Sequence, residues 1–176
     1  GLISFVVAGI IALIGLIQLI KRKSIKKVDK EIIFSGGLYV FIGIIFLFFE
    51  FVVINNRPVL MDGVLEASYP STHTLLATAI LGSAGILFSR LIKNKKCLLV
   101  IESSLGLILL VVVAGRLISG VHWLTDIIGG LILGSSLVML YYSVNDIHMK
   151  KIGEEVEKST MTDIIATPKN VENKEN

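Results

Sequence analysis

The stretch LISFVVAGIIALIGLIQLI, residues 2–20, contains no charged residue and is long enough to cross a lipid bilayer as a single helix. A transmembrane helix needs about 20 predominantly apolar residues, because each residue advances only about 1.5 Å through the hydrocarbon core. Four further apolar runs follow, at residues 32–49, 74–89, 97–115 and 127–144. Backbone groups that face lipid must be paired within their own segment, which favours helices. The sequence therefore predicts an all-α, polytopic membrane bundle with five transmembrane helices.

The composition supports this fold class and excludes others. Hydrophobic residues make up 53% of the chain, and the mean hydropathy of +0.80 exceeds that of soluble domains. The single cysteine, Cys97, excludes a disulfide within the chain. We expect one transmembrane domain over residues 1–144. A polar tail over residues 145–176 should form a short cytoplasmic helix followed by disorder.

Basic residues predict the orientation of the chain in the membrane. The connections after the first and third apolar runs both carry clusters of Lys and Arg, and both must lie on the same side of the bilayer. These residues are Lys21, Arg22, Lys23, Lys26, Lys27, Lys30, Arg90, Lys93, Lys95 and Lys96. Positive loops remain in the cytoplasm, so we expect a multi-pass plasma-membrane protein with a cytoplasmic tail. The net charge of +3 is explained by these loops and indicates no nucleic-acid partner.

The opposite, outer face gathers the residues that could perform chemistry. Segments around residues 55–73 and 114–126 meet there and contribute two arginines, two histidines and one aspartate. These are Arg57, His73, Arg116, His122 and Asp126. Residues far apart in sequence are therefore predicted to converge at one membrane surface.

These residue types suit phosphoryl transfer without a metal. Arginine offers paired donors that match phosphate oxygens. Ser71 is expected to cap the third helix, whose free N–H groups favour an anion. His122 and Asp126 are four residues apart, on one helical face, so the carboxylate can orient the imidazole. One histidine can attack phosphorus while the other protonates the departing oxygen.

Three segments resemble the signature of the type 2 phosphatidic acid phosphatase superfamily. That signature reads Lys-x6-Arg-Pro, Pro-Ser-Gly-His and Ser-Arg-x5-His-x3-Asp. The corresponding segments here are EFVVINNRP (50–58), PSTH (70–73) and GRLISGVHWLTD (115–126). The resemblance spans residues 32–142. Membrane members usually have six helices with the site on the outer face, which implies that one N-terminal helix precedes this chain.

The resemblance implies a role for each matching residue. His122 would be the nucleophile that forms a phosphohistidine, oriented by Asp126, and His73 would be the general acid. Substrate-binding residues would be Arg57, Arg116, Ser71 and Thr72. No metal and no cofactor is implied.

Glu50, Thr72 and Gly115 depart from the family pattern. Glu50 stands where the family has lysine, and a carboxylate repels phosphate. It either pairs with Arg57 or Arg116 and orients it, or has no catalytic part. Thr72 replaces glycine, a mild change if only its backbone amide is used, and Gly115 replaces a serine.

The sequence thus predicts an integral membrane phosphatase acting on a lipid phosphate or diphosphate, such as undecaprenyl diphosphate, phosphatidylglycerol phosphate or phosphatidic acid. The alternative is a catalytically degenerate protein that only binds lipid phosphate, with Glu50 marking the decayed site. A third hypothesis is a metal-dependent hydrolase whose ligands are His73, His122 and Asp126. It is disfavoured because two arginines beside a cation are poorly placed electrostatically.

Overall fold

Five long helices make up the protein in the computed structural model, which describes residues 2–166. They are α1 (Leu2–Arg22), α2 (Lys30–Phe51), α3 (Thr72–Leu91), α4 (Lys95–Ile118) and α5 (Leu124–Ala166), with a short 3-10 turn, Ile25–Lys27, between α1 and α2. Each helix covers one predicted apolar run, and all five are long and apolar enough to span a membrane. The predicted fold class is confirmed.

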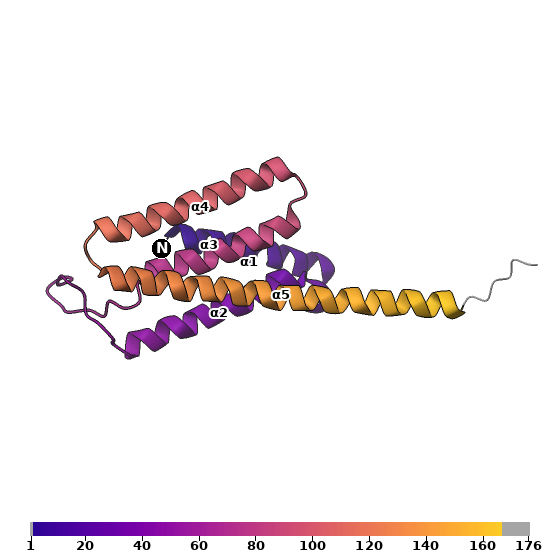
Figure 1. The fold of residues 1–176 in the computed structure, drawn as a ribbon, viewed down its shortest axis with the longest axis horizontal. Helices are drawn as coiled ribbons and strands as arrows, with labels where there is room; N and C mark the ends of the chain where they lie inside the picture. Colours follow the sequence, from indigo (N-terminus) through magenta and orange to yellow (C-terminus); the bar gives the residue numbers. More distant parts are fainter. Residues whose placement is uncertain (1, 167–176) are drawn as a thin grey trace, which may run out of the picture.

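Helix α3 forms the centre of the bundle. It contacts each of the other four long helices, and residues on several of its faces, such as Leu75, Ala79 and Leu87, are buried. Helix α4 lies at the periphery (Figure 1) and contains no buried residue. The most extensive contact of α3 is with α5, and both α3 and α5 begin at the predicted site.

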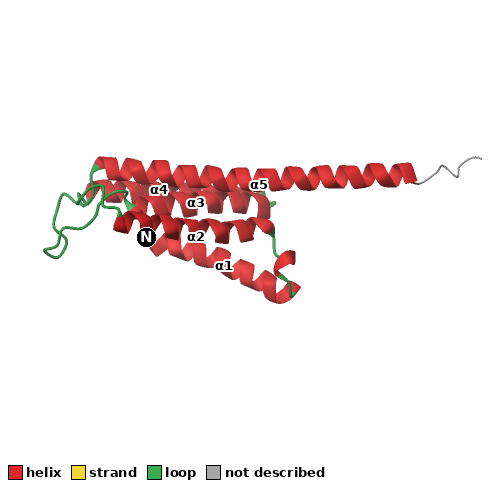
Figure 2. Ribbon diagram, turned by 90° about the horizontal axis from the view of Figure 1, so that it is seen from below, coloured by secondary structure: helices red, strands yellow, loops and turns green. Residues whose placement is uncertain are grey.

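The connections between helices separate to the two ends of the bundle. The long α2–α3 segment and the short α4–α5 segment lie at one end, and the α1–α2 and α3–α4 connections lie at the other (Figure 2). The two basic loops therefore share one end, as the sequence predicts. The segments that carry the candidate catalytic residues share the opposite end.

Glycines let the first turns of α5 approach the start of α3. A Cβ atom added at Gly130 would lie 2.8 Å from the carbonyl oxygen of Ser71. One added at Gly134 would lie 2.6 Å from Cβ of Thr78. At this short distance the Ser71 amide donates a hydrogen bond to the Asp126 carbonyl, with N and O 2.9 Å apart. The close packing thereby joins the beginnings of two helices at the site.

Helix α5 extends well beyond the rest of the bundle, at the end where the basic loops lie (Figures 1 and 2). It continues through the expected boundary at residues 144–145 to Ala166 without a break. The first part of the expected tail is therefore a direct continuation of the fifth transmembrane helix. The disorder expected at the end of the tail concerns residues 167–176, outside the described residues.

Candidate active site

The segment between α2 and α3 folds back on itself as a hairpin. At its tip, Met61 and Val64 exchange two backbone hydrogen bonds, each 2.9 Å long. The two residues between them, Asp62 and Gly63, have φ angles of 51° and 81°. Positive φ at both central residues characterises the two-residue turn that matches the twist of a hairpin, and Asp-Gly is a preferred sequence for it.

The hairpin arms set Arg57 and Ser68 in place. The Arg57 amide donates to the Glu66 carbonyl at 3.0 Å, and the Ser68 amide donates to the Asn55 carbonyl at 2.8 Å. Indole Nε1 of Trp123, immediately before α5, donates to the Asn56 carbonyl at 2.8 Å. The hairpin is thus tied to the beginning of α5, where the second half of the candidate site lies.

Asp126 is fixed in the first turn of α5. Its Oδ2 accepts a hydrogen bond from the Trp123 amide at 2.9 Å, as a carboxylate does when it caps the helix that contains it. Ser68 Oγ also donates to this oxygen in a short hydrogen bond. The Asp126 side chain is fully buried, and His122 is 6% exposed.

The two ring nitrogens of His122 face different partners. Nδ1 lies 3.3 Å from Ser68 Oγ and 3.7 Å from Asp126 Oδ2. Nε2 lies 3.4 Å from Nη1 of Arg57. His122 and Asp126 are close together, as predicted, but they do not share a helical face, because α5 begins at Leu124 and His122 lies in the bend before it. The Ser68 hydroxyl is nearer to the imidazole than the carboxylate is.

His122 lies outside the membrane-spanning helices, and its environment favours the neutral imidazole. Burial lowers its pKa from the ordinary value of 6.5, and the positive charges of Arg57 and Arg116 lower the pKa further. The negative charge of Asp126 opposes this shift. Neutral imidazole has a free lone pair and is therefore able to act as a nucleophile at neutral pH.

A cavity of about 480 Å³ opens beside His122. Its lining combines polar and charged side chains from the hairpin with aromatic and apolar ones from α2. The lining residues are Phe46, Phe49, Glu50, Val53, Arg57, Leu65, Glu66, Ala67, Ser68, Tyr69, Pro70, Thr72 and His122. Four residues considered for the site from the sequence, Glu50, Arg57, Thr72 and His122, therefore meet at one cavity.

Ser71, His73 and Arg116 are predicted site residues that are not among the residues lining this cavity. Ser71 occupies the N-cap position of α3, but its hydroxyl makes no capping hydrogen bond. Ser71 is buried, and its Oγ accepts a side-chain hydrogen bond from Thr74 Oγ1 at 3.1 Å. His73 lies in the first turn of α3 and Arg116 in the last turn of α4. Both are near enough to His122 to interact with it electrostatically.

The carboxylate that pairs with Arg57 is Glu66 and not Glu50. Arg57 Nε lies 3.1 Å from Glu66 Oε2. Glu50, at the end of α2, lines the cavity and forms no ion pair within residues 2–166. The described residues thus do not show the pairing of Glu50 with Arg57 or Arg116 that one interpretation expects, and the other, a carboxylate with no catalytic part, stays a prediction.

Sequence reasoning missed Ser68, Glu66 and the Trp123 hydrogen bond. Asp62-Gly63, between apolar residues, was an available signal for a two-residue hairpin. That hairpin would have set Arg57 opposite Glu66. No comparable local signal marks Ser68, because its contacts with His122 and Asp126 depend on tertiary structure.

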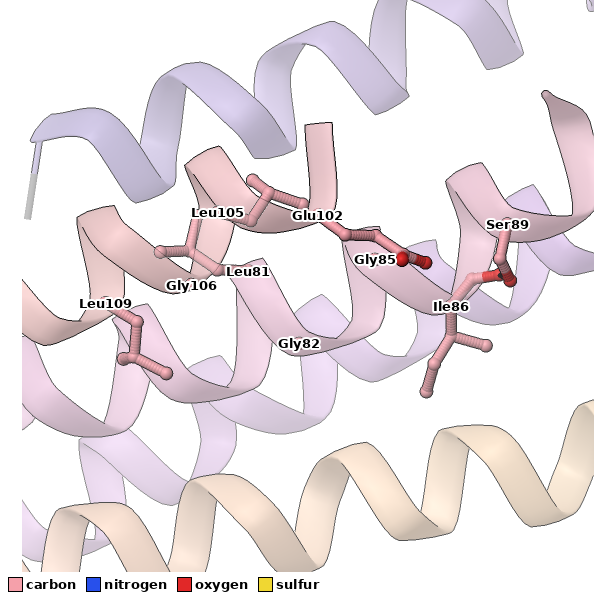
Figure 3. Close-up of a pocket in the computed structure, with 9 residues that line it drawn as sticks. All are labelled: Leu81, Gly82, Gly85, Ile86, Ser89, Glu102, Leu105, Gly106 and Leu109. Carbon is pink, nitrogen blue, oxygen red and sulfur yellow. Dashed lines mark hydrogen bonds between the residues drawn. The ribbon is translucent and has the colours of Figure 1, made fainter. Parts of the chain in front are cut away.

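The described residues contain no group of three or more His, Cys, Asp and Glu side chains arranged to hold a metal ion. A second cavity, of about 350 Å³, lies between α3 and α4, far along the bundle from His122. Figure 3 shows Glu102 of α4 reaching across it toward Gly85 and Ser89 of α3. None of its lining residues belongs to the candidate active site.

Comparisons with known proteins agree with the fold and identify a family. The PAP2 superfamily matches residues 33–150 of the chain. Among solved structures, the fold is similar to that of a transmembrane PAP2-type phosphatidylglycerolphosphate phosphatase from Bacillus subtilis, with a TM-score of 0.59 and 19% sequence identity. The similarity covers 82% of this chain and 75% of that one. A search of curated proteins gave no match.

Proposed function

The chain belongs to the PAP2 superfamily, and from that membership we propose that it is an integral membrane phosphatase that hydrolyses a lipid phosphate or diphosphate. The observation that carries the proposal is the orientation of His122. Its Nδ1 faces Ser68 and Asp126, while its Nε2 faces the guanidinium of Arg57. A phosphate bound by Arg57 would therefore meet the free lone pair of the imidazole.

The proposed reaction proceeds in two displacements. The Nε2 lone pair of His122 attacks phosphorus, the bond from phosphorus to the leaving oxygen breaks, and His73 gives a proton to that oxygen. A water molecule then attacks the phosphohistidine and passes a proton to His73, and the P–N bond breaks to release phosphate. Arg57 and Arg116, with the amides of Thr72 and His73 at the start of α3, would stabilise the charge on the phosphoryl oxygens.

A lipid substrate is supported by the apolar surface that continues from the cavity. Phe46, Phe49, Pro70 and Thr72 line both the active-site cavity and an adjoining apolar one. Phe46 also lines a third cavity of about 260 Å³, between α1, α2 and α3, whose lining is almost entirely apolar. A headgroup at Arg57 would thus allow its hydrocarbon chain to extend along α2. The Bacillus subtilis protein acts on phosphatidylglycerol phosphate, which makes this lipid the first candidate.

We place the site at the outer face of the plasma membrane. The supporting observation is that the hairpin and the α4–α5 connection lie opposite the two basic loops (Figure 2). Basic loops favour the cytoplasm. The C-terminal part of α5 would then project into the cytoplasm.

Phosphate release by the purified protein in detergent tests the proposal. The substrates are phosphatidylglycerol phosphate, phosphatidic acid and undecaprenyl diphosphate, each assayed with and without EDTA. We expect turnover of at least one lipid in EDTA, and its loss in His122→Ala, because this variant lacks the proposed nucleophile. The control is Ser136→Ala, which removes an exposed hydroxyl bonded only within α5.

Two other outcomes would contradict the proposal. Lipid phosphate binding without turnover, unaffected by His122→Ala, would favour a protein that only binds lipid phosphate, in which Glu50 marks a decayed catalytic site. Turnover abolished by EDTA and restored by a divalent metal would instead favour a metal-dependent hydrolase.

A further inference from the structure

Ser68 lies between the two residues of the proposed nucleophilic pair. Its side chain is 2% exposed, and its Oγ contacts both His122 Nδ1, at 3.3 Å, and Asp126 Oδ2. The direct separation of Nδ1 and Oδ2, 3.7 Å, is too long for a hydrogen bond. Contact between the imidazole and the carboxylate therefore runs through the serine hydroxyl.

The number of protons on these groups decides the direction of each hydrogen bond. A serine hydroxyl has one proton to donate and two lone pairs with which to accept. An ionised carboxylate only accepts, so the proton of Ser68 is committed to Asp126 Oδ2. Towards His122, Ser68 can then act only as an acceptor, and Nδ1 must carry the ring proton.

The contact on the other side of the imidazole is compatible with the same tautomer. Arg57 has only N–H donors, and its Nη1 lies 3.4 Å from His122 Nε2. An unprotonated Nε2 can accept this contact, but the contact is too long to fix the tautomer by itself. Ser68 is therefore the neighbour that selects a proton on Nδ1 and a lone pair on Nε2.

We propose that Ser68 is a positioning residue, which holds His122 in its Nδ1–H tautomer by linking it to Asp126. This inference rests on the proposed function in one respect, since the tautomer matters for catalysis only if Nε2 is the nucleophile. Asp126 Oδ1 is buried and has no hydrogen-bond partner within the described residues. Oδ2, held by Trp123 and Ser68, is thus the oxygen through which the carboxylate acts.

Ring nitrogen-15 NMR of the histidines tests the tautomer without requiring activity. The protein has three histidines, His73, His122 and His148, and the signal lost in His122→Asn identifies the one of interest. In the wild-type protein at neutral pH we expect Nδ1 protonated and Nε2 unprotonated. In Ser68→Ala we expect a substantial population protonated on Nε2, while Ser136→Ala should give the wild-type spectrum. An unchanged His122 signal in Ser68→Ala would overturn the inference.

Kinetics of the same variants separate this inference from the proposed function. We expect Ser68→Ala to lower kcat by about 10- to 100-fold, as when the partner that orients a functional histidine is removed, with little change in KM. The pH at which kcat falls on the acidic side should also change, because His122 loses its hydrogen-bond partner Ser68. The ionisable and charged groups that still face His122 are Arg57, Arg116, His73 and Asp126.

The combined results distinguish the two claims. If the wild-type protein hydrolyses none of the lipids but Ser68→Ala still changes the tautomer, the proposed function fails and the role of Ser68 stands. If the wild-type protein is active and Ser68→Ala leaves both the tautomer and kcat unchanged, the role of Ser68 fails and the proposed function stands.

Discussion

At the scale of single residues, the pKa of His122 predicts how activity depends on pH. Burial and the neighbouring arginines lower this pKa from 6.5, so the imidazole stays unprotonated at pH values where an ordinary histidine is charged. Because attack requires the unprotonated ring, the rate should persist below pH 6.5 and fall only as pH passes through the lowered pKa. Initial rates measured between pH 4 and pH 8 give the pH at which activity falls to half. A midpoint at or above 6.5 would contradict the prediction.

Glu50 gives a second prediction at this scale. Its carboxylate lines the cavity where phosphate is proposed to bind, and like charges repel. Glu50→Gln should therefore lower KM up to about fivefold, since an interaction between exposed charges amounts to about 0.2–1 kcal/mol. Steady-state kinetics at low and high salt check this, and the effect should shrink at high salt.

The outcome for Glu50→Lys separates an active enzyme from a decayed one. An active wild-type protein should show no large gain in kcat, because Arg57 already has its partner in Glu66. Barely detectable wild-type turnover, raised strongly by Glu50→Lys, would show that the site had decayed from the family pattern.

How much of the site the sequence predicts depends on whether contacts are local. His122 and Asp126 are four residues apart on one chain segment, so their spacing alone predicts their proximity. Ser68 is 54 residues from His122, and their contact exists only because the hairpin, α3 and the start of α5 pack together. For the same reason, the Glu66 partner of Arg57 was not predicted, and only Glu50 was considered as a carboxylate that pairs with Arg57 or Arg116. Glu50 is near Arg57 in sequence, but the hairpin sets Glu66 opposite it.

At the scale of elements, the glycines of α5 predict which helix–helix contact least tolerates a larger side chain. A methyl group at Gly130 would lie 2.8 Å from a backbone atom of α3, and backbone cannot turn away as a side chain can. Gly130→Ala should therefore destabilise the protein by about 1–3 kcal/mol, the usual cost of overpacking. Thermal unfolding in detergent measures the effect.

Gly85→Ala is the matched control for this contact. Gly85 also lies within a membrane-spanning helix, but a Cβ there meets nothing within 4 Å. The substitution should be neutral or stabilising, because alanine favours a helix by about 1 kcal/mol over glycine. Equal destabilisation by both variants would mean that tight α3–α5 packing is not the cause.

Helices were predictable here because length and hydropathy are properties of a continuous segment. All five apolar runs became helices. The boundary expected near residue 144 rested on a change of composition, but α5 continues to Ala166. A change from apolar to polar residues indicates where a helix leaves the hydrocarbon core. It does not end the helix here, because the polar residues that follow include good helix formers such as Lys and Glu.

At the scale of the whole molecule, the arrangement of loops predicts sidedness. A single-cysteine variant, Val64→Cys with Cys97→Ser, carries its thiol at the exposed tip of the hairpin. It should react with a membrane-impermeant thiol reagent applied to intact cells. The wild-type protein has only Cys97, exposed at the start of α4 among basic residues. That thiol should react only after the cells are permeabilised.

The length of α5 is a second property at this scale. Its 43 residues correspond to about 65 Å at 1.5 Å per residue, roughly twice the thickness of a hydrocarbon core. About half of the helix must therefore lie outside the hydrocarbon. If thiol labelling showed the hairpin inside the cell, this half of α5 would project outside it and the proposed orientation would be wrong.

Asp62 and Gly63 lie away from the proposed reacting atoms, but their positive φ angles restrict which residues these two positions can accept. Most side chains lose about 1–2 kcal/mol in that conformation, and glycine, asparagine and aspartate tolerate it best. A random substitution at either position would disturb the turn that sets Arg57 and Ser68 against His122, although neither residue touches them. In a library of all single mutants, positions 62 and 63 should accept few residue types, whereas the neighbouring exposed Val59 and Leu60 should accept many.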